Sequence, residues 1–445
     1  LLNHIVTMLK KYLNNKFFIS TLILLIGGAI SKILGFILKI FITRSLGTYG
    51  VGIYSLLNPT YSFLIVICIF SMPIAVSSLI ATEKENNKKV IISSLFFICI
   101  FNTIIVLIVI LLSSFISNTL LHEPLLNYPI MCIGLVLPFI GISSVIKGYF
   151  WGKQKMFPYV LSNIIEQITR ISILFYLIPI FIKKDLILTI GCIILTNIIS
   201  ETVSIIVMLL FIPKDKKICK EDIHISRSSI KEVISISLPA TSSKIVGSIA
   251  YFLEPIILFS TLLYVGYSKN YIIMEYGIIN GYSLSLLLLP SFFTQSISTS
   301  LVPELSKYYQ KKNYKKCISR IKQICIVSFI IGLMFTTVIY IFSSSLLNIL
   351  FNTSLGINYI KILAPFILLY FIELPLSASL EALKKSRIEM NITVITSLIR
   401  LLLIFILSLF KIGLYSLIIS IIFNLIFTVL LEIIYLKKMF SSSYK

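Results

Sequence analysis

The apolar run FFISTLILLIGGAISKILGFILKIFIT, residues 17–43, decides the fold of this chain. It is longer than the roughly 20 residues that an α-helix needs to cross a bilayer. It is also too long for the core of a signal peptide, and no small-residue cleavage site follows it. Lys32 lies near the middle of the run, and a lysine near the middle of a bilayer costs about 3 kcal/mol. The run therefore predicts a membrane-spanning helix that keeps a cation for a functional reason.

Runs of this kind recur along the 445 residues, of which 58% are hydrophobic and only 13% are charged. The mean hydropathy is +1.02. This balance excludes a soluble domain and predicts an all-α integral membrane protein. We predict about twelve transmembrane helices in two six-helix lobes, at roughly 17–43, 54–81, 90–116, 127–150, 157–181, 186–212, 233–264, 277–303, 322–346, 356–380, 390–410 and 413–436.

The formal net charge of +22 is explained by membrane topology, so we predict no nucleic-acid partner. The connections between the predicted spans alternate in charge. One set, which includes both termini, carries about 27 Lys and Arg, and the other carries about five. Basic residues collect in cytoplasmic loops. We therefore predict a multi-pass protein of the cell membrane, with an even number of spans and both termini in the cytoplasm.

An internal repeat divides the chain into two halves of the same orientation. Three dipeptides recur at one common offset, and two cations recur after a slip of three positions: Tyr49-Gly50 with Tyr276-Gly277, Lys88-Lys89 with Lys315-Lys316, Pro138-Phe139 with Pro365-Phe366, Lys155 with Lys385, and Arg170 with Arg400. We predict an N-terminal lobe at 1–213, a cytoplasmic linker at 214–232 and a C-terminal lobe at 233–445. Transporters built from repeats place their substrate between the halves, near the bilayer midplane.

The opening helix of each half carries a lysine that directly follows a serine. In the first helix, Lys32 and Lys39 alternate with Gly28 and Gly35 on one stripe, which leaves room beside the ammonium groups for a bulky ligand. In the seventh helix, Lys244 belongs to a polar stripe that runs from Ser237 through Thr241 to Pro255. The alternative is a packed seam with snorkelling lysines, which suits Lys39 better than Lys32. We predict that these lysines bind an anionic group in a central cavity.

Two arginines are further candidates for that cavity. Arg170 shares a helix face with Glu166, so the two can form an i,i+4 ion pair that requires no substrate. Its repeat equivalent, Arg400, has Thr396 in place of the acid. Arg400 must therefore find a carboxylate elsewhere or bind an anion.

Three carboxylates within predicted spans are candidates for proton or sodium coupling. They are Glu166, Glu201 and Glu373. The alternative for each is an ordinary hydrogen bond between helices. Glu254, near the outer end of the seventh helix, is expected to be structural. Snorkelling is expected for the charged residues near span ends, which are Arg44, Lys147 and Glu432.

Several chemistries are excluded. No GxxxxGK[ST] phosphate loop occurs, because Gly152-Lys153 is followed by Gln154. The seven cysteines form no CxxC pair, and the three histidines lie outside the apolar runs. We therefore predict no metal and no cofactor. The short non-cytoplasmic loops are nearly free of acidic residues, so we also predict that the chain is not an enzyme.

The stretch SKILGFILKIFITRSLGTYGVGIYSLLNPTYSFLIVICIFSMPIAVSSLIA, residues 31–81, resembles the opening of the stage V sporulation protein B family. Gly148, Lys155, Pro158 and the segment 164–170 resemble a second pattern of that family. The family belongs to the MATE-like MOP superfamily, which also contains lipid II and O-antigen flippases. By position, Lys32 and Lys39 match first-helix cations held to be important in the lipid II branch. The second and eighth helices have no equivalent cation.

This resemblance implies two six-helix lobes around a cation-lined cavity. It implies transport of an undecaprenyl-pyrophosphate-linked saccharide from the inner to the outer leaflet. The repeat predicts alternating access by rocking of the two halves about residues 213–232, and we name cell-wall or polysaccharide synthases as candidate partners. Two other functions stay open. A cation-coupled multidrug antiporter would use Glu166 or Glu201 to exchange drug for an ion. A non-transporting scaffold for envelope or spore-wall assembly would have no need of Lys32 and Lys244.

Overall fold

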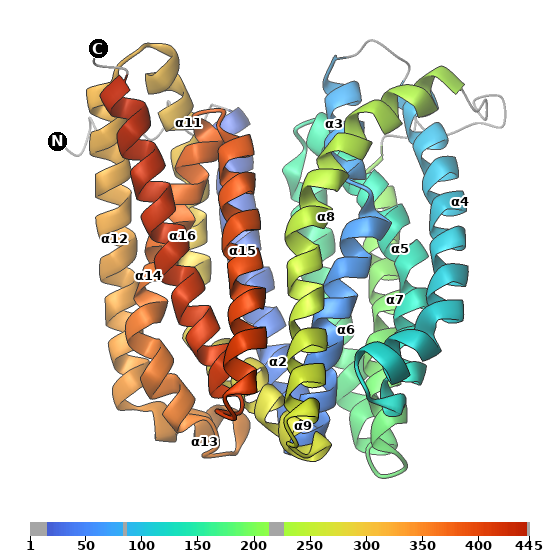
Figure 1. The fold of residues 1–445 in the computed structure, drawn as a ribbon. Helices are drawn as coiled ribbons and strands as arrows, with labels where there is room; N and C mark the ends of the chain where they lie inside the picture. The colour runs from blue at the N-terminus through green and yellow to red at the C-terminus, as the bar shows by residue number, and fades with distance from the viewer. Residues whose placement is uncertain (1–15, 83–86, 213–226, 443–445) are drawn as a thin grey trace. The chain divides into compact units, whose positions relative to one another are not determined.

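A computed structural model describes residues 16–82, 87–212 and 227–442 of the chain. Within these ranges the regular elements are helices, and none is a strand. They form two compact units, drawn in Figure 1. Unit 1 consists of the described residues of Leu1–Lys39, Tyr61–Thr119 and Glu123–Ile245, and unit 2 of those of Ile40–Thr60, Leu120–His122 and Val246–Lys445. The unit boundaries fall inside two helices, α2 and α8, and on either side of the short segment Leu120–His122. Most of the predicted linker at 214–232 lies outside the described residues, and the predicted division into 1–213 and 233–445 stays a prediction.

Six helices in the first half and six in the second supply the framework of the units. Those of the first half are α2 (Lys16–Ile69), α3 (Met72–Thr82), α4 (Asn87–Ser114), α5 (Asn127–Gly152), α6 (Met156–Phe181) and α7 (Leu186–Leu210). Those of the second half are α8 (Arg227–Tyr264), α11 (Ser291–Gln310), α12 (Tyr314–Ile341), α14 (Ile357–Ala382), α15 (Ser386–Leu409) and α16 (Tyr415–Ser442). The short helices α9 (Lys269–Gly277), α10 (Leu284–Leu287) and α13 (Ser343–Phe351) join them, with π-helical turns at Phe115–Leu120 and Ile278–Ser283 and a 3-10 turn at Pro124–Leu126.

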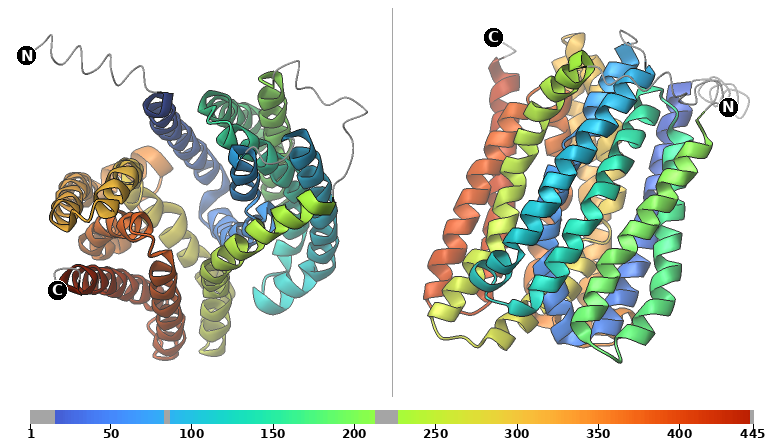
Figure 2. Two further views of the ribbon diagram at one scale, coloured as in Figure 1. Left: turned by 90° about the horizontal axis from the view of Figure 1, so that it is seen from above. Right: turned by 90° about the vertical axis from the view of Figure 1, so that its right-hand side faces the viewer.

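The helix bounds confirm the internal repeat. Helices α4 and α12 have 28 residues each, and their first residues, Asn87 and Tyr314, directly precede the repeated Lys-Lys dipeptides. Helices α5 and α14 have 26 residues each, and each contains a proline at the repeat position, Pro138 or Pro365. The packing repeats as well. In unit 1, α5 contacts α3, α4 and α7, and in unit 2, α14 contacts α11, α12 and α16. The left view of Figure 2 shows the helices of each unit end-on.

The described helices account for the predicted spans. Ten of them are long and apolar enough to cross a membrane, or eleven if a bent pair counts as one span. The stretch Ile26–Thr82 is counted once, although its 57 residues contain two predicted spans. Gly47 divides it, because a φ of 66° breaks the helix at a residue without a Cβ. The eighth predicted span, 277–303, is the bent pair, in which the two helices meet at 57° next to Pro290.

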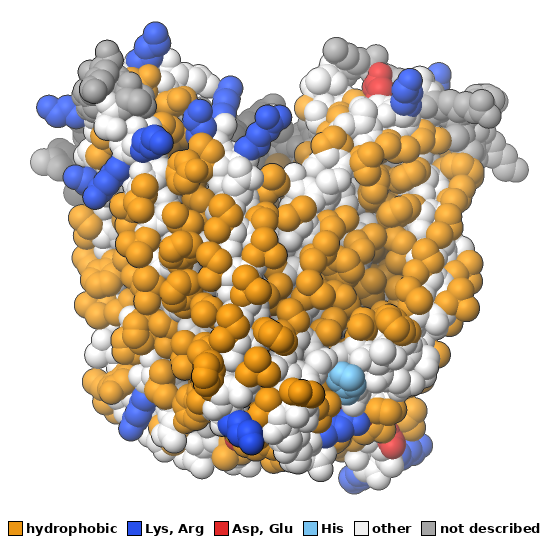
Figure 3. Space-filling view, in the orientation of Figure 1, with side chains coloured by type: hydrophobic (Ala, Val, Ile, Leu, Met, Phe, Trp, Pro, Cys, Tyr) orange, Lys and Arg blue, Asp and Glu red, His pale blue; other side chains and the backbone are white. Residues whose placement is uncertain are grey.

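The outer surface of the helices suits a bilayer. Large apolar side chains are exposed along α12 and α15, among them Leu333, Met334, Leu398 and Leu402. Figure 3 shows hydrophobic side chains over the middle of α15 and α16, with Lys and Arg toward the ends of unit 2. An exposed apolar belt between charged ends indicates lipid contact.

In unit 2, two backbones approach closely at Gly52 of α2 and Gly277 of α9. A Cβ on Gly52 would lie 2.3 Å from the backbone oxygen of Ile273, and a Cβ on Gly277 would lie 2.5 Å from the Cα of Gly52. Small residues at such positions let membrane helices pack backbone to backbone. No side chain fits there without a shift of the main chain.

Replacing Gly277 with alanine is expected to destabilise the protein by roughly 1–3 kcal/mol, because the added methyl group forces the two backbones apart. Thermal unfolding of the purified protein in detergent measures the effect. Gly247→Ala is the matched control, because a Cβ at Gly247 meets nothing within 4 Å. Equal unfolding temperatures for the two variants would contradict the close packing described here.

Candidate functional site

Helix α2 presents Lys32 on an open face. Gly27, on a neighbouring face, packs so closely on α6 that a Cβ there would lie 1.9 Å from a methyl group of Val160. Gly28, by contrast, has nothing within 4 Å of its Cβ position, and Gly35 has only the side-chain oxygen of Gln167 at 4.0 Å. Lys32 is exposed between these two glycines, and Lys39 is half-buried. The glycines therefore leave space on both sides of the Lys32 side chain.

Helix α8 presents Lys244 in a similar way. Lys244 is exposed, and Gly247, one turn further along, has nothing within 4 Å of its Cβ position. The residues of the polar stripe predicted on this helix do not share one environment, however. Ser237 and Thr241 are buried, and the Thr241 hydroxyl donates to the Ser237 carbonyl at 2.7 Å. The cation and the buried hydroxyls thus face different surroundings.

Four charged residues of unit 1 form a buried cluster between α5, α6 and α7. The predicted pair is confirmed, with Arg170 Nη2 at 2.8 Å from Glu166 Oε1. Arg170 also donates to the Ser200 hydroxyl at 3.2 Å and 3.3 Å. Lys147 Nζ lies 3.8 Å from Glu166 and 3.8 Å from Glu201. Two cations therefore compensate two carboxylates, which lowers the cost of burying all four. The expectation that Lys147 snorkels is wrong.

Unit 2 holds a different set of charges at the repeat-equivalent positions. Arg400 of α15 forms an ion pair with Glu254 of α8, which supplies the carboxylate that Thr396 does not. The Arg400 Nε is buried without a hydrogen-bond partner. Glu254 is 2% exposed, in keeping with the structural role expected for it. Arg170 and Arg400 therefore each bind a carboxylate within their own unit.

A second difference between the charges of the two units concerns Glu432 of α16. It is 1% exposed, and one of its oxygens accepts a hydrogen bond from Ser377 of α14 at 2.6 Å. Its Oε2 is buried without a hydrogen-bond partner, and among the described residues no Lys or Arg lies within 4.0 Å of it. The expectation that Glu432 snorkels is wrong. A buried carboxylate of this kind requires a proton or a cation.

The repeat explains why Glu432 differs from its equivalent in unit 1. Ser377 lies as far after Lys147 in the sequence as Arg400 lies after Arg170. Glu432 lies one position further than this distance after Glu201. The lysine that faces Glu201 is therefore a serine in unit 2, which leaves Glu432 with a hydroxyl in place of an ammonium group. This difference between the units could be found in the sequence, because Ser377 is the repeat equivalent of Lys147.

Glu373 lies close to this position in the sequence of α14. It comes one helical turn before Ser377, so the two share a face of the helix, and it is partly buried. Glu373 and Glu432 each lie within a candidate membrane span of unit 2, and neither has a described ion pair.

Arg44 of α2 has a structural partner. Its guanidinium donates to the backbone carbonyls of Leu350 at 2.8 Å and of Ile349, at the C-terminal end of α13. A cation at this end stabilises a helix by satisfying its last carbonyls and opposing its dipole. Arg44 is therefore a helix cap within unit 2.

The repeated helices and the exposed apolar belt define a helical membrane protein built from an internal repeat. The fold is that of an inward-facing multidrug resistance transporter of the MATE family, with a TM-score of 0.78 at 17% identity over 93% of this chain and 95% of the other. A MOP superfamily transporter from Pyrococcus furiosus, described as having a binding pocket of reversed polarity, gives a TM-score of 0.66 at 18% identity, over 97% of each chain.

The chain belongs to the polysaccharide biosynthesis protein family, whose model matches residues 19–309. A MatE model matches residues 279–406. The chain is 29% identical to stage V sporulation protein B of Bacillus subtilis, over 87% of this chain and 77% of that protein. It is 24% identical to sporulation protein YkvU of the same organism, over 82% of each. The prediction of an all-α, MATE-like membrane fold is confirmed.

Proposed function

We propose that the chain is a flippase for an anionic undecaprenyl-pyrophosphate-linked saccharide, a precursor of peptidoglycan or another polysaccharide. It moves this lipid from the inner to the outer leaflet by alternating access. The observation that carries the proposal is the exposed Lys32, placed deep within a membrane helix between two glycines that leave space beside it. A pyrophosphate bound there offsets the cost of keeping a cation in the membrane. Lys244 on α8 and Lys39 on α2 are the further binding residues in this proposal.

The membrane potential favours the proposed direction. With the cell interior negative, outward movement of an anion gains about 2.3 kcal/mol per charge for each 100 mV. The relatives named for polysaccharide biosynthesis and sporulation support a saccharide-bearing substrate. Arg170 and Arg400 contribute less in this proposal, because each is already bound to a carboxylate.

We place ion coupling in unit 2, at Glu432 with Glu373 beside it. Glu166 and Glu201 are compensated by Arg170 and Lys147, so they have less need of an added cation. Glu432 has a buried oxygen without a hydrogen-bond partner and a single donor, Ser377. Binding and release of a proton or sodium ion at this carboxylate would alter the packing of α14 against α16.

Replacing Glu432 with glutamine is expected to abolish the dependence of transport on an imposed proton or sodium gradient. The amide keeps the shape of the side chain and the bond to Ser377, but it cannot exchange a proton or balance a cation. Transport in proteoliposomes, with and without each gradient, measures the effect. Glu304→Gln is the control, because Glu304 pairs with Arg320 at a more exposed position, where ion pairs contribute little. If transport by Glu432→Gln still depended on the gradient, Glu432 would be excluded as the ion-coupling site.

A cation-coupled multidrug antiporter is the second candidate, and the buried carboxylate of Glu432 is the observation that favours it. Reconstituted vesicles distinguish the two functions. Exposure of a lipid-linked saccharide on the outer leaflet supports the flippase, and efflux of a fluorescent organic cation without such exposure supports the antiporter. A scaffold would show neither activity, and neutralising Lys32 and Lys244 would leave its function intact.

A further inference from the structure

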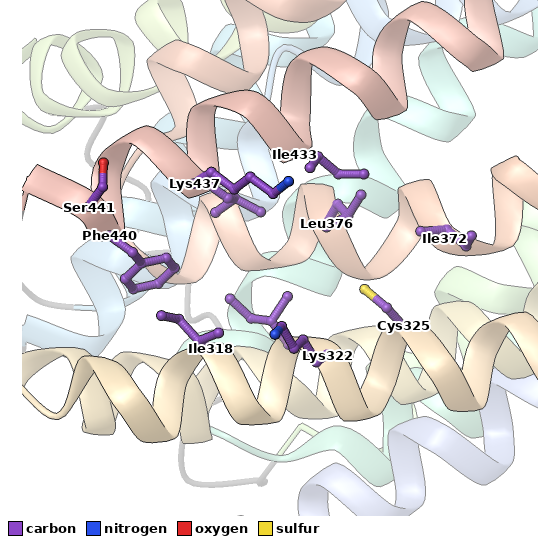
Figure 4. Close-up of a pocket in the computed structure, with 11 residues that line it drawn as sticks. Ile318, Lys322, Cys325, Ile372, Leu376, Ile433, Lys437, Phe440 and Ser441 are labelled. Atoms are coloured by element: carbon purple, nitrogen blue, oxygen red, sulfur yellow. The ribbon is translucent and has the colours of Figure 1, made fainter.

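A cavity of about 440 Å³ opens in unit 2, and none of its lining residues belongs to α2 or α8. Figure 4 shows it between α12 on one side and α14 and α16 on the other. Its lining consists of apolar side chains, two lysines, one cysteine and one serine: Ile318, Ile321, Lys322, Cys325, Ile372, Leu376, Ile433, Leu436, Lys437, Phe440 and Ser441. The volume lies within the range of roughly 300–1,000 Å³ typical of ligand sites.

The walls of the cavity are parts of membrane spans. Its residues fall in the candidate spans Tyr314–Ile341, Ile357–Ala382 and Tyr415–Ser441. Along α12 the cavity reaches from Ile318 to Cys325, about two helical turns. Its floor is the core of unit 2, where Ile321 and Leu376 are buried. An occupant must therefore be largely apolar.

The charge of the lining selects the occupant further. Lys322 and Lys437 both line the cavity, from α12 and α16, and the lining contains no acidic residue. Among the described residues, neither lysine has a carboxylate within 4.0 Å. Basic pockets between membrane helices bind the head groups of anionic lipids. An apolar slot with two cations and no acid matches a lipid that has an acyl chain and a negatively charged phosphate.

We propose that this cavity is a binding site for an anionic phospholipid, with its phosphate between Lys322 and Lys437 and an acyl chain along Ile372 and Leu376. The lipid comes from the leaflet at the C-terminal end of α16, which the charge pattern predicts to be cytoplasmic. The site is independent of the proposed transport site, because all of its lining residues lie in unit 2 and none belongs to α2 or α8. The bound lipid joins α12 to α16 and stabilises unit 2.

Native mass spectrometry of the full chain in detergent tests the proposal with phosphatidylglycerol and phosphatidylcholine of identical acyl chains. We expect one tightly retained phosphatidylglycerol and no equivalent phosphatidylcholine. Each lysine near a phosphate is expected to contribute roughly fivefold in affinity, so Lys322→Gln/Lys437→Gln weakens retention about 25-fold. Lys438→Gln is the matched control, because Lys438 neighbours Lys437 on α16 but does not line the cavity. Equal retention of the two lipids, or unchanged retention in the double variant, would overturn the proposal.

A second variant separates the cavity from the charged surface around it. Cys325→Trp fills the apolar end of the cavity and leaves both lysines in place. We expect it to lose phosphatidylglycerol as the double variant does, with an unchanged elution volume to show that the protein is folded. Retention in Cys325→Trp together with loss in the lysine variant would mean that lipid binds to the basic surface and not in the cavity.

Discussion

Replacing both Lys32 and Lys244 with alanine is expected to lower the rate of lipid-linked saccharide flipping by at least about 100-fold, since a hydrogen bond to a charged group contributes roughly 1.5–3 kcal/mol. Both lysines are exposed on helix faces that glycines leave open, so their removal creates no buried cavity. The fold should therefore survive. Reconstitution with candidate lipid-linked precursors, scored by their exposure on the outer leaflet, measures the rate.

The matched control for this experiment is Lys184→Ala. Lys184 is also an exposed lysine, but it lies between α6 and α7, with its ammonium group 5.7 Å from the centre of the Phe181 ring. The Lys184→Ala variant should flip lipid at the wild-type rate. Lys32→Arg/Lys244→Arg should keep much of the activity, because arginine also binds phosphate. Unchanged flipping in the double alanine variant would remove the proposed binding role of both residues.

Replacing Lys147 with serine is expected to destabilise the protein by about 3–5 kcal/mol, because it breaks a buried ion pair and leaves a charge without compensation. Glu166 would keep its ion pair with Arg170, but Glu201 would have no Lys or Arg within 4.0 Å among the described residues. Serine is the informative replacement, since Ser377 occupies the equivalent position of unit 2. Thermal unfolding in detergent, read as loss of helix signal, measures the change.

A compensating variant distinguishes lost charge balance from lost packing. Lys147→Ser/Glu201→Gln removes one charge of each sign, so it should recover most of the stability lost in Lys147→Ser. Lys184→Ala should unfold like the wild type, because its ammonium group is exposed. If the double variant is as unstable as Lys147→Ser, the role of Lys147 is packing rather than charge compensation.

The helical framework could be predicted from the sequence because its causes are local. Apolar runs of sufficient length fix where membrane helices lie, and these runs match the described helices within a few residues at most ends. The repeat was visible in short matches such as Pro138 and Pro365, which lie inside equivalent helices of equal length. The Glu166–Arg170 pair was also local, since residues four apart on a helix lie on one face.

The partners of the other buried charges depended on how helices pack within each unit. Lys147 reaches carboxylates on two other helices, and Arg400 reaches Glu254, which is distant in the sequence. Rotation of a helix by a fraction of a turn would change these pairs without altering its hydropathy. The sequence by itself determined the helices, their repeat and the positions of charged residues along them. Only the tertiary structure decided which charges meet, because a buried charge is compensated by whatever group the packing brings within a few ångströms.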